Sequence, residues 1–585
     1  MSVLSRPAPH VGYREGPRGF ELQLGRLVLS QSTYLLAAAV VVGLGGGFGA
    51  IGFRWLIGIE SSFAFGALVP HLAGAVPHAL ALVAVVACGG AFAAWIAATF
   101  APEARGHGVP EVMAAVALHG GTIRPRVIGI KALASATSIG FGGSCGREGP
   151  IVQIGSAIGS VLGRAARAPA PVVRTLVACG AAAGISATFN APIGGVFFAS
   201  EVILGDFAPR SFAVIVVSSV LAAVVSRAYL GNRPSFDASG FTLVSPRELV
   251  LYAVLGLICA FWAWGFVKLL YAIEDAVEKL KWPSPLIGAT GFAGVGLIAV
   301  FAPQVLGVGY ESIQRTLDGH TPGGLGFALA FLKPLATSLT LGFGGSGGVF
   351  APSLFGGAML GDAYGSVVHA AFPSWTAAPA AYALVAMAAA FAAAAEAPIT
   401  AIVIVFEMSG DYTIVLPLMI ATVISSLAGR RLLGSTVYEM KLIRRGIDWH
   451  AVRKPRPLAN VLVSSLEHPP AVVLRATDTL EAAAARVAGS SEALVPVVDD
   501  DGTFLGFVAV ADLAAHVSAT GASIIAPLVR DAPIVFTGDE SLERAIEPMV
   551  EPDVALLPIL DAAGKLRSIV SRRDVLDAYR SLRPM

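Results

Sequence analysis

Two glycine-rich turns carry residues whose types and spacing could bind an ion. GREGP (146–150) and GVFAP (348–352) each place glycine and proline directly before an apolar run. Proline suits the first turn of a helix, and glycine allows close approach to the backbone. A helix N-terminus presents free N–H groups and about half a positive charge. Two such ends facing one cavity would form an anion site, and GHGVPEV (106–112) offers a third.

Glu148 lies inside the first of these turns, beside Arg147. Holding an ionisable residue at membrane depth is costly, so such a residue is usually functional. A carboxylate next to anion-binding amides can occupy the site and exclude the anion until it is protonated or moves away. Glu148 is therefore predicted to act as a gate and a pH sensor. The alternative is a helix-capping glutamate paired with Arg147.

The elements that position these turns are duplicated. Residues 139–159 and 341–361 share nine identities at a constant offset of 202, and residues 190–202 resemble 396–408 at an offset of 206. Two matches in the same order indicate an internal repeat. Interrupted segments at corresponding positions of two halves are typical of inverted-repeat transporters.

The composition indicates that a membrane surrounds these repeats. Only 14% of the residues are charged, against about 25% in soluble domains, and the mean hydropathy is +0.73. The net charge of +1 gives no basic surface for nucleic acid. Apolar stretches of spanning length lie near residues 33–58, 78–100, 211–230, 248–274, 285–303 and 413–434. Shorter segments broken by glycine or proline lie near residues 126–139, 151–165, 192–204, 350–361 and 398–408.

The three turns resemble the loop motifs of the CLC family of chloride channels and proton/chloride antiporters. The family's GSGIP, GK/REGP and GxFxP read GHGVP, GREGP and GVFAP here, and Tyr438 fits the pore tyrosine expected after the last membrane helix. The resemblance covers residues 30–445. It implies an all-α, multi-span membrane fold with two inverted repeats and broken helices, and a homodimer with one anion pathway in each subunit.

The resemblance also implies a set of site residues. Glu148 would be the gating glutamate, and the Tyr438 hydroxyl would donate to the central anion. Simpler explanations are packing of the Phe350 ring and a membrane-interface position for Tyr438. The other anion-binding positions that the resemblance carries over are His107, Gly108, Arg147, Gly149, Val349 and Phe350.

His107 replaces the serine that the family usually has in its first motif. An imidazole donates a hydrogen bond when it is neutral and carries a charge when it is protonated near neutral pH. Neutral His107 could hydrogen-bond an anion, and protonated His107 could hold one tightly or attract Glu148. Alternatively, the ring turns away and bonds a backbone carbonyl. The effect on anion preference and pH dependence therefore stays open.

Val202 stands where many antiporters of the family have an inner glutamate, directly after Glu201. Without a carboxylate there, a proton route from the cytoplasm to Glu148 lacks its entry point. The sequence therefore favours a passive, gated chloride channel that responds to pH or voltage, with a proton-coupled antiporter as the alternative. Glu201 and Glu407, at corresponding positions of the two repeats, are instead expected to accept hydrogen bonds from the backbone.

The end of the chain contains a second duplication, with an offset of 62 between its copies. It resembles the tandem CBS pair of many CLC proteins, which is an α/β domain. Such pairs often bind adenine nucleotides through Gly-x-x-Ser/Thr-x-x-Asp. The second copy keeps Ser571 and Asp574 but lacks the glycine, and the first copy lacks the hydroxyl. A nucleotide sensor and a purely structural, dimer-bracing tail both stay open.

The distribution of charge divides the chain into parts. Residues 456–585 hold 11 Lys/Arg and 18 Asp/Glu, whereas the rest holds 29 and 21. Basic residues near the N-terminus and after the last membrane helix place both termini in the cytoplasm, for a protein of the plasma (inner) membrane. The expected parts are a cytoplasmic N-terminal segment (1–30), a transmembrane chloride pathway (31–440), a basic linker (441–458) and tandem CBS domains (459–585, about 459–520 and 521–585).

Other classes of protein fit the sequence less well. A divalent-cation transporter with CBS domains, a remote alternative, would need an acidic pore, whereas the membrane part is basic. A membrane metalloprotease would need His-Glu-x-x-His, which does not occur in the sequence. We therefore expect a non-enzyme with no required cofactor and no metal site. Its expected partners are the lipid bilayer, chloride and, for an antiporter, protons.

Overall fold

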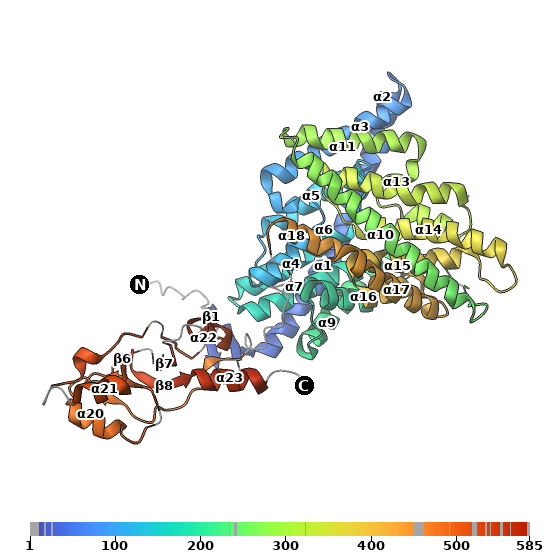
Figure 1. Cartoon of the computed structure of the whole chain (residues 1–585). Coiled ribbons are helices and arrows are strands. Elements are labelled where there is room, and N and C mark those ends of the chain that lie inside the picture. The colour runs from blue at the N-terminus through green and yellow to red at the C-terminus, as the bar shows by residue number, and fades with distance from the viewer. Residues whose placement is uncertain are drawn as a thin grey trace, which may run out of the picture. The chain divides into compact units, whose positions relative to one another are not determined.

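The chain divides into two compact units, Met1–Arg453 and Lys454–Met585 (Figure 1). Residues 1–10 of the predicted N-terminal segment and residues 450–458 of the predicted linker lie outside the described residues. The computed structural model describes residues 11–581 except 17–18, 25–26, 233, 239–240, 242, 322, 448, 450–460, 491, 518–522, 533–534, 539, 550–553 and 562.

The first unit is mostly helical and contains two runs of elements in the same order. A small antiparallel sheet, which the sequence did not predict, precedes them: β1 (Val11–Gly16), β2 (Gly19–Leu24) and β3 (Leu27–Ser30). The first run comprises α3 (His78–Phe100), η2 (Pro102–Ala104), α4 (Val109–Leu118), α5 (Arg126–Gly140), α6 (Glu148–Ala165), α7 (Ala170–Phe189), α8 (Pro192–Phe198), η3 (Ala199–Leu204) and α9 (Pro209–Leu230).

The second run repeats this order and confirms the predicted duplication. It comprises α11 (Ser284–Phe301), η4 (Pro303–Val305), α12 (Tyr310–Leu317), α13 (Gly323–Gly342), α14 (Phe350–Ala371), α15 (Pro379–Ala395), α16 (Pro398–Ser409) and α17 (Val415–Leu433). The equivalent helices α3 and α11 lie side by side (Figure 1). Outside the two runs are α1 (Gln31–Ser61), η1 (Ser62–Leu68), α2 (Val69–Ala73), α10 (Glu248–Glu278) and α18 (Val437–Arg444).

Eight helical stretches among the described residues are long and apolar enough to cross a membrane. The predicted long spans are among them, but Ala170–Phe189 and Gly323–Gly342 are also spans, which the prediction missed. α14 extends to Ala371, about ten residues past the short segment predicted for it. α15 is buried from Ala380 to its end, and its alanine-rich sequence allows neighbouring helices to pack closely around it.

Two buried lysines extend the repeat beyond the glycine-rich turns. Lys131 in α5 and Lys333 in α13 stand at the same offset of 202, and neither is exposed. Each ammonium group donates to two carbonyl groups, at 2.9 Å and 2.9 Å to Ala104 and Gly106 for Lys131, and at 2.8 Å and 2.7 Å to Val305 and Gly307 for Lys333. Each lysine thereby fixes the loop that leads into the next short helix and places a positive charge inside the helical unit.

The second unit consists of two copies of a small α/β element. The helices and strands start at positions that differ by 62 residues, which confirms the second duplication. Each copy has two antiparallel strands with a register shift at the same place and its own apolar core. The copies comprise β4 (Leu474–Arg475), α20 (Leu480–Val487), β5 (Leu494–Val498), β6 (Phe504–Ala509) and α21 (Val510–Val517), and then α22 (Leu542–Met549), β7 (Leu556–Leu560), β8 (Leu566–Ser571) and α23 (Arg572–Ser581).

Candidate anion site

The amino ends of three helices come together in the first unit. α6 begins at Glu148 and α14 at Phe350, and their preceding turns are paired. The Gly146 N–H donates to the Gly348 carbonyl at 2.8 Å, and the Gly348 N–H donates to the Gly146 carbonyl at 2.6 Å. The turn before α4 joins them, since the Gly106 N–H donates to the Gly345 carbonyl, in the turn before α14, at 3.1 Å. The positive ends of helices from both repeats therefore face one place.

Glycine is required where these turns touch. A Cβ atom on Gly149 would overlap the carbonyl oxygen of His107. Gly108 has a φ of +80°, in the left-handed region that favours glycine. A side chain at either position would push the start of α4 away from the start of α6, and so would open the site.

A small pocket lies where the helix ends meet. Two residues predicted to bind the anion, Gly108 and Arg147, are not among the described residues that line this pocket. Gly108 shapes the turn before α4, and the Arg147 guanidinium is directed to the Thr188 carbonyl at 3.4 Å. The pocket is lined by six of the predicted site residues, His107, Glu148, Gly149, Val349, Phe350 and Tyr438, and by Val109, Ile185, Phe198 and Gly348.

The Glu148 carboxyl group is held at one oxygen and free at the other. Only 1% of Glu148 is exposed, and the Tyr310 hydroxyl donates to its Oε1. Oε2 has no hydrogen-bond partner among the residues that the structure describes. Within the described structure no hydrogen bond joins the side chains of Glu148 and Arg147, but their opposite charges attract each other. The backbone N–H groups of Glu148 and Ala351, at the starts of α6 and α14, also act on the carboxyl group.

Tyr310 is a site residue that the sequence analysis missed. It is the first residue of α12, and its ring lies 5.0 Å from the Arg147 guanidinium carbon and 5.8 Å from the Phe236 ring. It also lines an open cavity of about 480 Å³, so it contacts both that cavity and Glu148. A signal exists in the sequence, because GVGY (307–310) repeats the Gly-x-Gly of GHGV at an offset of 201.

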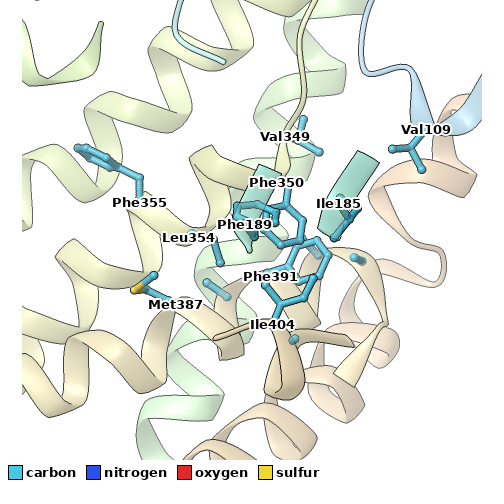
Figure 2. Close-up of a cluster of buried hydrophobic side chains, with 14 of the residues drawn as sticks. Val109, Ile185, Phe189, Val349, Phe350, Leu354, Phe355, Met387, Phe391 and Ile404 are labelled. Atoms are coloured by element: carbon cyan, nitrogen blue, oxygen red, sulfur yellow. The ribbon is translucent and has the colours of Figure 1, made fainter. Parts of the chain in front are cut away.

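The Phe350 ring packs into the core, as the simpler explanation expects. Its centroid lies 5.0 Å from that of Phe189 and 4.2 Å from that of Phe391, and Figure 2 shows the three rings together, away from Val109. Only the backbone of Phe350, at the start of α14, is left to act on an anion. Tyr438 is 2% exposed and lines the pocket, so it does not belong to a membrane-interface belt.

His107 lines the pocket, and no carbonyl group among the described residues accepts a hydrogen bond from its Nδ1. The residue is 3% exposed, and within the described structure its Nδ1 has no hydrogen-bond partner. The ring centroid lies 6.2 Å from that of Tyr271. A buried nitrogen without a partner is costly, so the geometry favours a ligand at this position that the polypeptide does not supply.

The inner-glutamate position is apolar and apart from the pocket. Val202 lies in η3, is 6% exposed, and is absent from the described pocket lining. Its neighbour Glu201 accepts from the Thr400 N–H at 2.8 Å and the Thr400 hydroxyl at 2.6 Å, at the start of α16. Glu407 accepts from the Ile193 and Gly194 N–H groups at 3.1 and 2.6 Å, at the start of α8. Both glutamates therefore accept backbone hydrogen bonds, as predicted, and each repeat caps a helix of the other.

A second, open cavity of about 510 Å³ begins next to His107. Its lining includes Gly106, Arg105 and basic residues of α18. Most of these cations have carboxylate partners, since Lys441 pairs with Glu274, and Arg444 with Asp275. Gly106 lines this cavity and the next residue, His107, lines the small pocket, so the two spaces share consecutive residues of one loop.

The tentative nucleotide residues in the tail are engaged within the protein. The Asp574 Oδ2 accepts from the Ser571 N–H at 2.8 Å and the Ser571 hydroxyl at 2.6 Å, and lies 3.0 Å from the His468 Nε2. Burial alone would raise the pKa of Asp574, but these hydrogen bonds hold it below its usual range. In the first copy, Asp512 pairs with Arg530 at 2.5 Å. The carboxylates thus act as internal hydrogen-bond acceptors.

The chain is similar to known proteins along most of its length. The sequence pattern described as "Voltage gated chloride channel" matches residues 89–430, and the CBS domain pattern matches residues 463–519 and 525–581. The chain is 33% identical over 348 residues to a putative chloride channel protein, ClcB-like, of Ralstonia nicotianae, which spans 58% of this chain and 80% of that protein. It is 31% identical over 445 residues to the H⁺/Cl⁻ exchange transporter ClcA of Citrobacter koseri, spanning 73% and 92%.

Solved structures with a similar fold cover most of the chain. A slow cyanobacterial Cl⁻/H⁺ antiporter matches with a TM-score of 0.66 and 27% identity, over 70% of this chain and 98% of that one. A eukaryotic CLC transporter matches with a TM-score of 0.61 and 21% identity, over 92% of this chain and 98% of that one. The second match shows the fold alone, and its coverage extends into the tail.

Proposed function

Since the chain belongs to the CLC family, we propose that it is a proton-coupled chloride antiporter whose gate is Glu148. The sequence had favoured a passive channel because of Val202. The relatives named as H⁺/Cl⁻ exchangers, one of them matched over 92% of its length, favour the antiporter instead. The observation that carries the proposal is the Glu148 carboxyl group, which lies buried in the pocket with one oxygen free.

The geometry supports an exchange cycle. Ionised Glu148 occupies the pocket, where the starts of α6 and α14 stabilise its charge. A chloride ion that takes its place uses the same N–H groups, at Gly149 and Phe350, and the Tyr438 hydroxyl. Protonation removes the charge of Glu148 and with it the attraction to the helix ends. Chloride entry and Glu148 protonation are thereby linked, because only one negative group fits the pocket at a time.

A liposome measurement tests the proposal. Purified protein in liposomes with a chloride gradient should move protons against their gradient as chloride leaves. In Glu148→Gln, which mimics the protonated form, chloride flux should persist without uphill proton movement and without dependence on pH. Chloride flux with no uphill proton movement by the unmodified protein would make it a channel.

We also propose that the protein is a homodimer with both termini in the cytoplasm. The basic residues Arg430, Arg431 and Lys441 to Arg445 near the end of the helical unit support this orientation. Light scattering of detergent-solubilised protein should give twice the mass of one chain. A cysteine-reactive, membrane-impermeant label should reach a cysteine introduced after Arg580 only from the cytoplasmic side.

A further inference from the structure

We infer that His107 passes protons between the open cavity of about 510 Å³ and Glu148. This rests on the proposed antiport, which requires a proton to reach Glu148 from the cytoplasm. His107 and Glu148 line the same small pocket, and the residue before His107 lines the open cavity on the side of α18. The imidazole therefore lies between that cavity and the gate.

The chemistry of the ring suits this role. An imidazole can take a proton on one nitrogen and release one from the other, and its charge changes near neutral pH. Nδ1 of His107 has no partner among the described residues, so it is available to accept or donate. The hydroxyl-bearing neighbours of the gate, Tyr310 and Tyr438, are phenols, which even in water titrate about three units above neutral pH.

The other candidate entry for protons is the inner-glutamate position in η3. Val202 has no ionisable group, and Glu201 is bound to the start of α16 by three hydrogen bonds. A proton on Glu201 would weaken the cap of that helix. Among the described residues that line the pocket, His107 and Glu148 are the ones with an imidazole or a carboxyl group.

The charges around His107 tie its protonation to chloride. Positive groups come from two elements that pack near it, Lys131 of α5 and Lys441 of α18, and from Arg445, whose charge is offset by Glu111 of α4 at 2.6 Å. The Tyr271 ring of α10 lies 6.2 Å from the His107 ring, and Tyr438 of α18 lines the same pocket. The ammonium group of Lys131 opposes a proton on the ring, and a negative group in the pocket, ionised Glu148 or chloride, offsets it. Protonation of His107 is thereby tied to which negative group the pocket holds during the exchange cycle.

The test uses the full-length protein in liposomes, with chloride and proton movement recorded together. His107→Ser restores the hydroxyl that the family usually has, so chloride flux should persist. Protons moved per chloride should fall at least about tenfold, since a general acid–base group contributes a factor of about 10²–10⁴. His119→Ser, which removes an exposed histidine at the end of the adjoining α4, is the matched control and should leave the ratio unchanged.

A rescue separates a proton route from a structural role. Val202→Glu, added to His107→Ser, supplies a carboxyl group at the other entry and should restore uphill proton movement. If His107→Ser moves no chloride, His107→Gln is tested instead, in a preparation that elutes as one species. The number of protons moved per chloride should again fall at least about tenfold.

The outcomes are distinct. An unmodified protein without uphill proton movement overturns the proposed antiport, and with it the need for a route. Coupled exchange that survives in the His107 variants overturns the proton role of His107 and leaves the antiport intact.

Discussion

The hydrogen bond from Tyr310 decides how firmly Glu148 is held. One carboxyl oxygen accepts it, and the other has no partner in the part of the chain that the structure describes. A gate of this kind must be stable in the pocket and yet leave it during each cycle. The Tyr310 hydroxyl adds to this hold, because a hydrogen bond to a charged group contributes about 1.5–3 kcal/mol.

Replacing Tyr310 by Phe keeps the ring under Arg147 and removes only the hydroxyl. The carboxylate should then leave the pocket more easily, and chloride flux at neutral pH should rise about tenfold, in line with the loss of about 1.5 kcal/mol. Flux from liposomes measures this. Tyr364→Phe, which loses a bond to the Leu251 carbonyl in another part of the unit, is the control. Equal flux in Tyr310→Phe and the unmodified protein would show that Tyr310 does not restrain the gate.

The site was predictable where the chain marks it with a local pattern. Glycine and proline before an apolar run locate the starts of α6 and α14, because turn and helix-start chemistry depends on a few adjacent residues. Tyr310 was missed because its hydroxyl meets Glu148 across 162 residues of sequence. The direction of the His107 ring could not be predicted either, since packing by Tyr271 and the pairing of loops set it.

At the scale of elements, the two repeats hold each other together at α8 and α16. Glu407 bonds the start of α8, and Glu201 bonds the start of α16. In a membrane interior, unpaired N–H groups at a helix start cannot turn to water. Each carboxylate therefore stabilises the start of a helix in the other repeat.

Glu407→Ala should lower the stability of the helical unit by about 1–3 kcal/mol, since it leaves the Ile193 and Gly194 N–H groups unpaired. Thermal unfolding in detergent, followed by circular dichroism, measures the loss. Glu311→Ala removes an exposed glutamate from α12 and should change little. If both variants unfold at the same temperature, the glutamate at α8 is not needed for the fold.

The tail contains a turn whose stability depends on pH. Hydrogen bonds from the backbone, chiefly that from the Thr503 N–H, hold the pKa of Asp499 below its usual range. Ionised Asp499 therefore stabilises the turn between β5 and β6 above pH of about 4, its unfolded value, and this contribution disappears as pH falls through the lower folded pKa.

Asp499→Ala should accelerate hydrogen exchange in β5 and β6 at neutral pH, and the difference from the unmodified protein should shrink in acid. Asp501→Ala, an exposed neighbour two residues on, is the control. A difference that persists below the folded pKa of Asp499 would contradict an ionic origin.

Membrane-spanning helices could be predicted where the apolar run is unbroken, and less well where the run contains a charged residue. Gly323–Gly342 was missed because Lys333 interrupts it, yet the ammonium group is satisfied by two carbonyl groups of a loop distant in sequence. The span at Ala170–Phe189 was missed because it contains Arg174 and many small residues. Small residues weaken a hydropathy signal while favouring close helix packing.

For the whole molecule, the two units have separate apolar cores. The tail's carboxylates at Asp574 and Asp512 are already bound by protein groups. Millimolar ATP should therefore leave both chloride flux and thermal unfolding unchanged. A ligand at 100 times its Kd would add about 2.7 kcal/mol of stability, so a clear upward shift in Tm would instead restore Ser571 and Asp574 as nucleotide ligands.

The capping of α16 by Glu201 also sets an order for biosynthesis. Glu201 and its partner Thr400 are 199 residues apart. At a synthesis rate of about 5–20 residues per second, the first half is in the membrane for about 10–40 seconds before its partner emerges from the ribosome. During that time Glu201 has no helix to bind, and the first half is an unfinished insertion intermediate. The insertion machinery must protect it until the second half arrives.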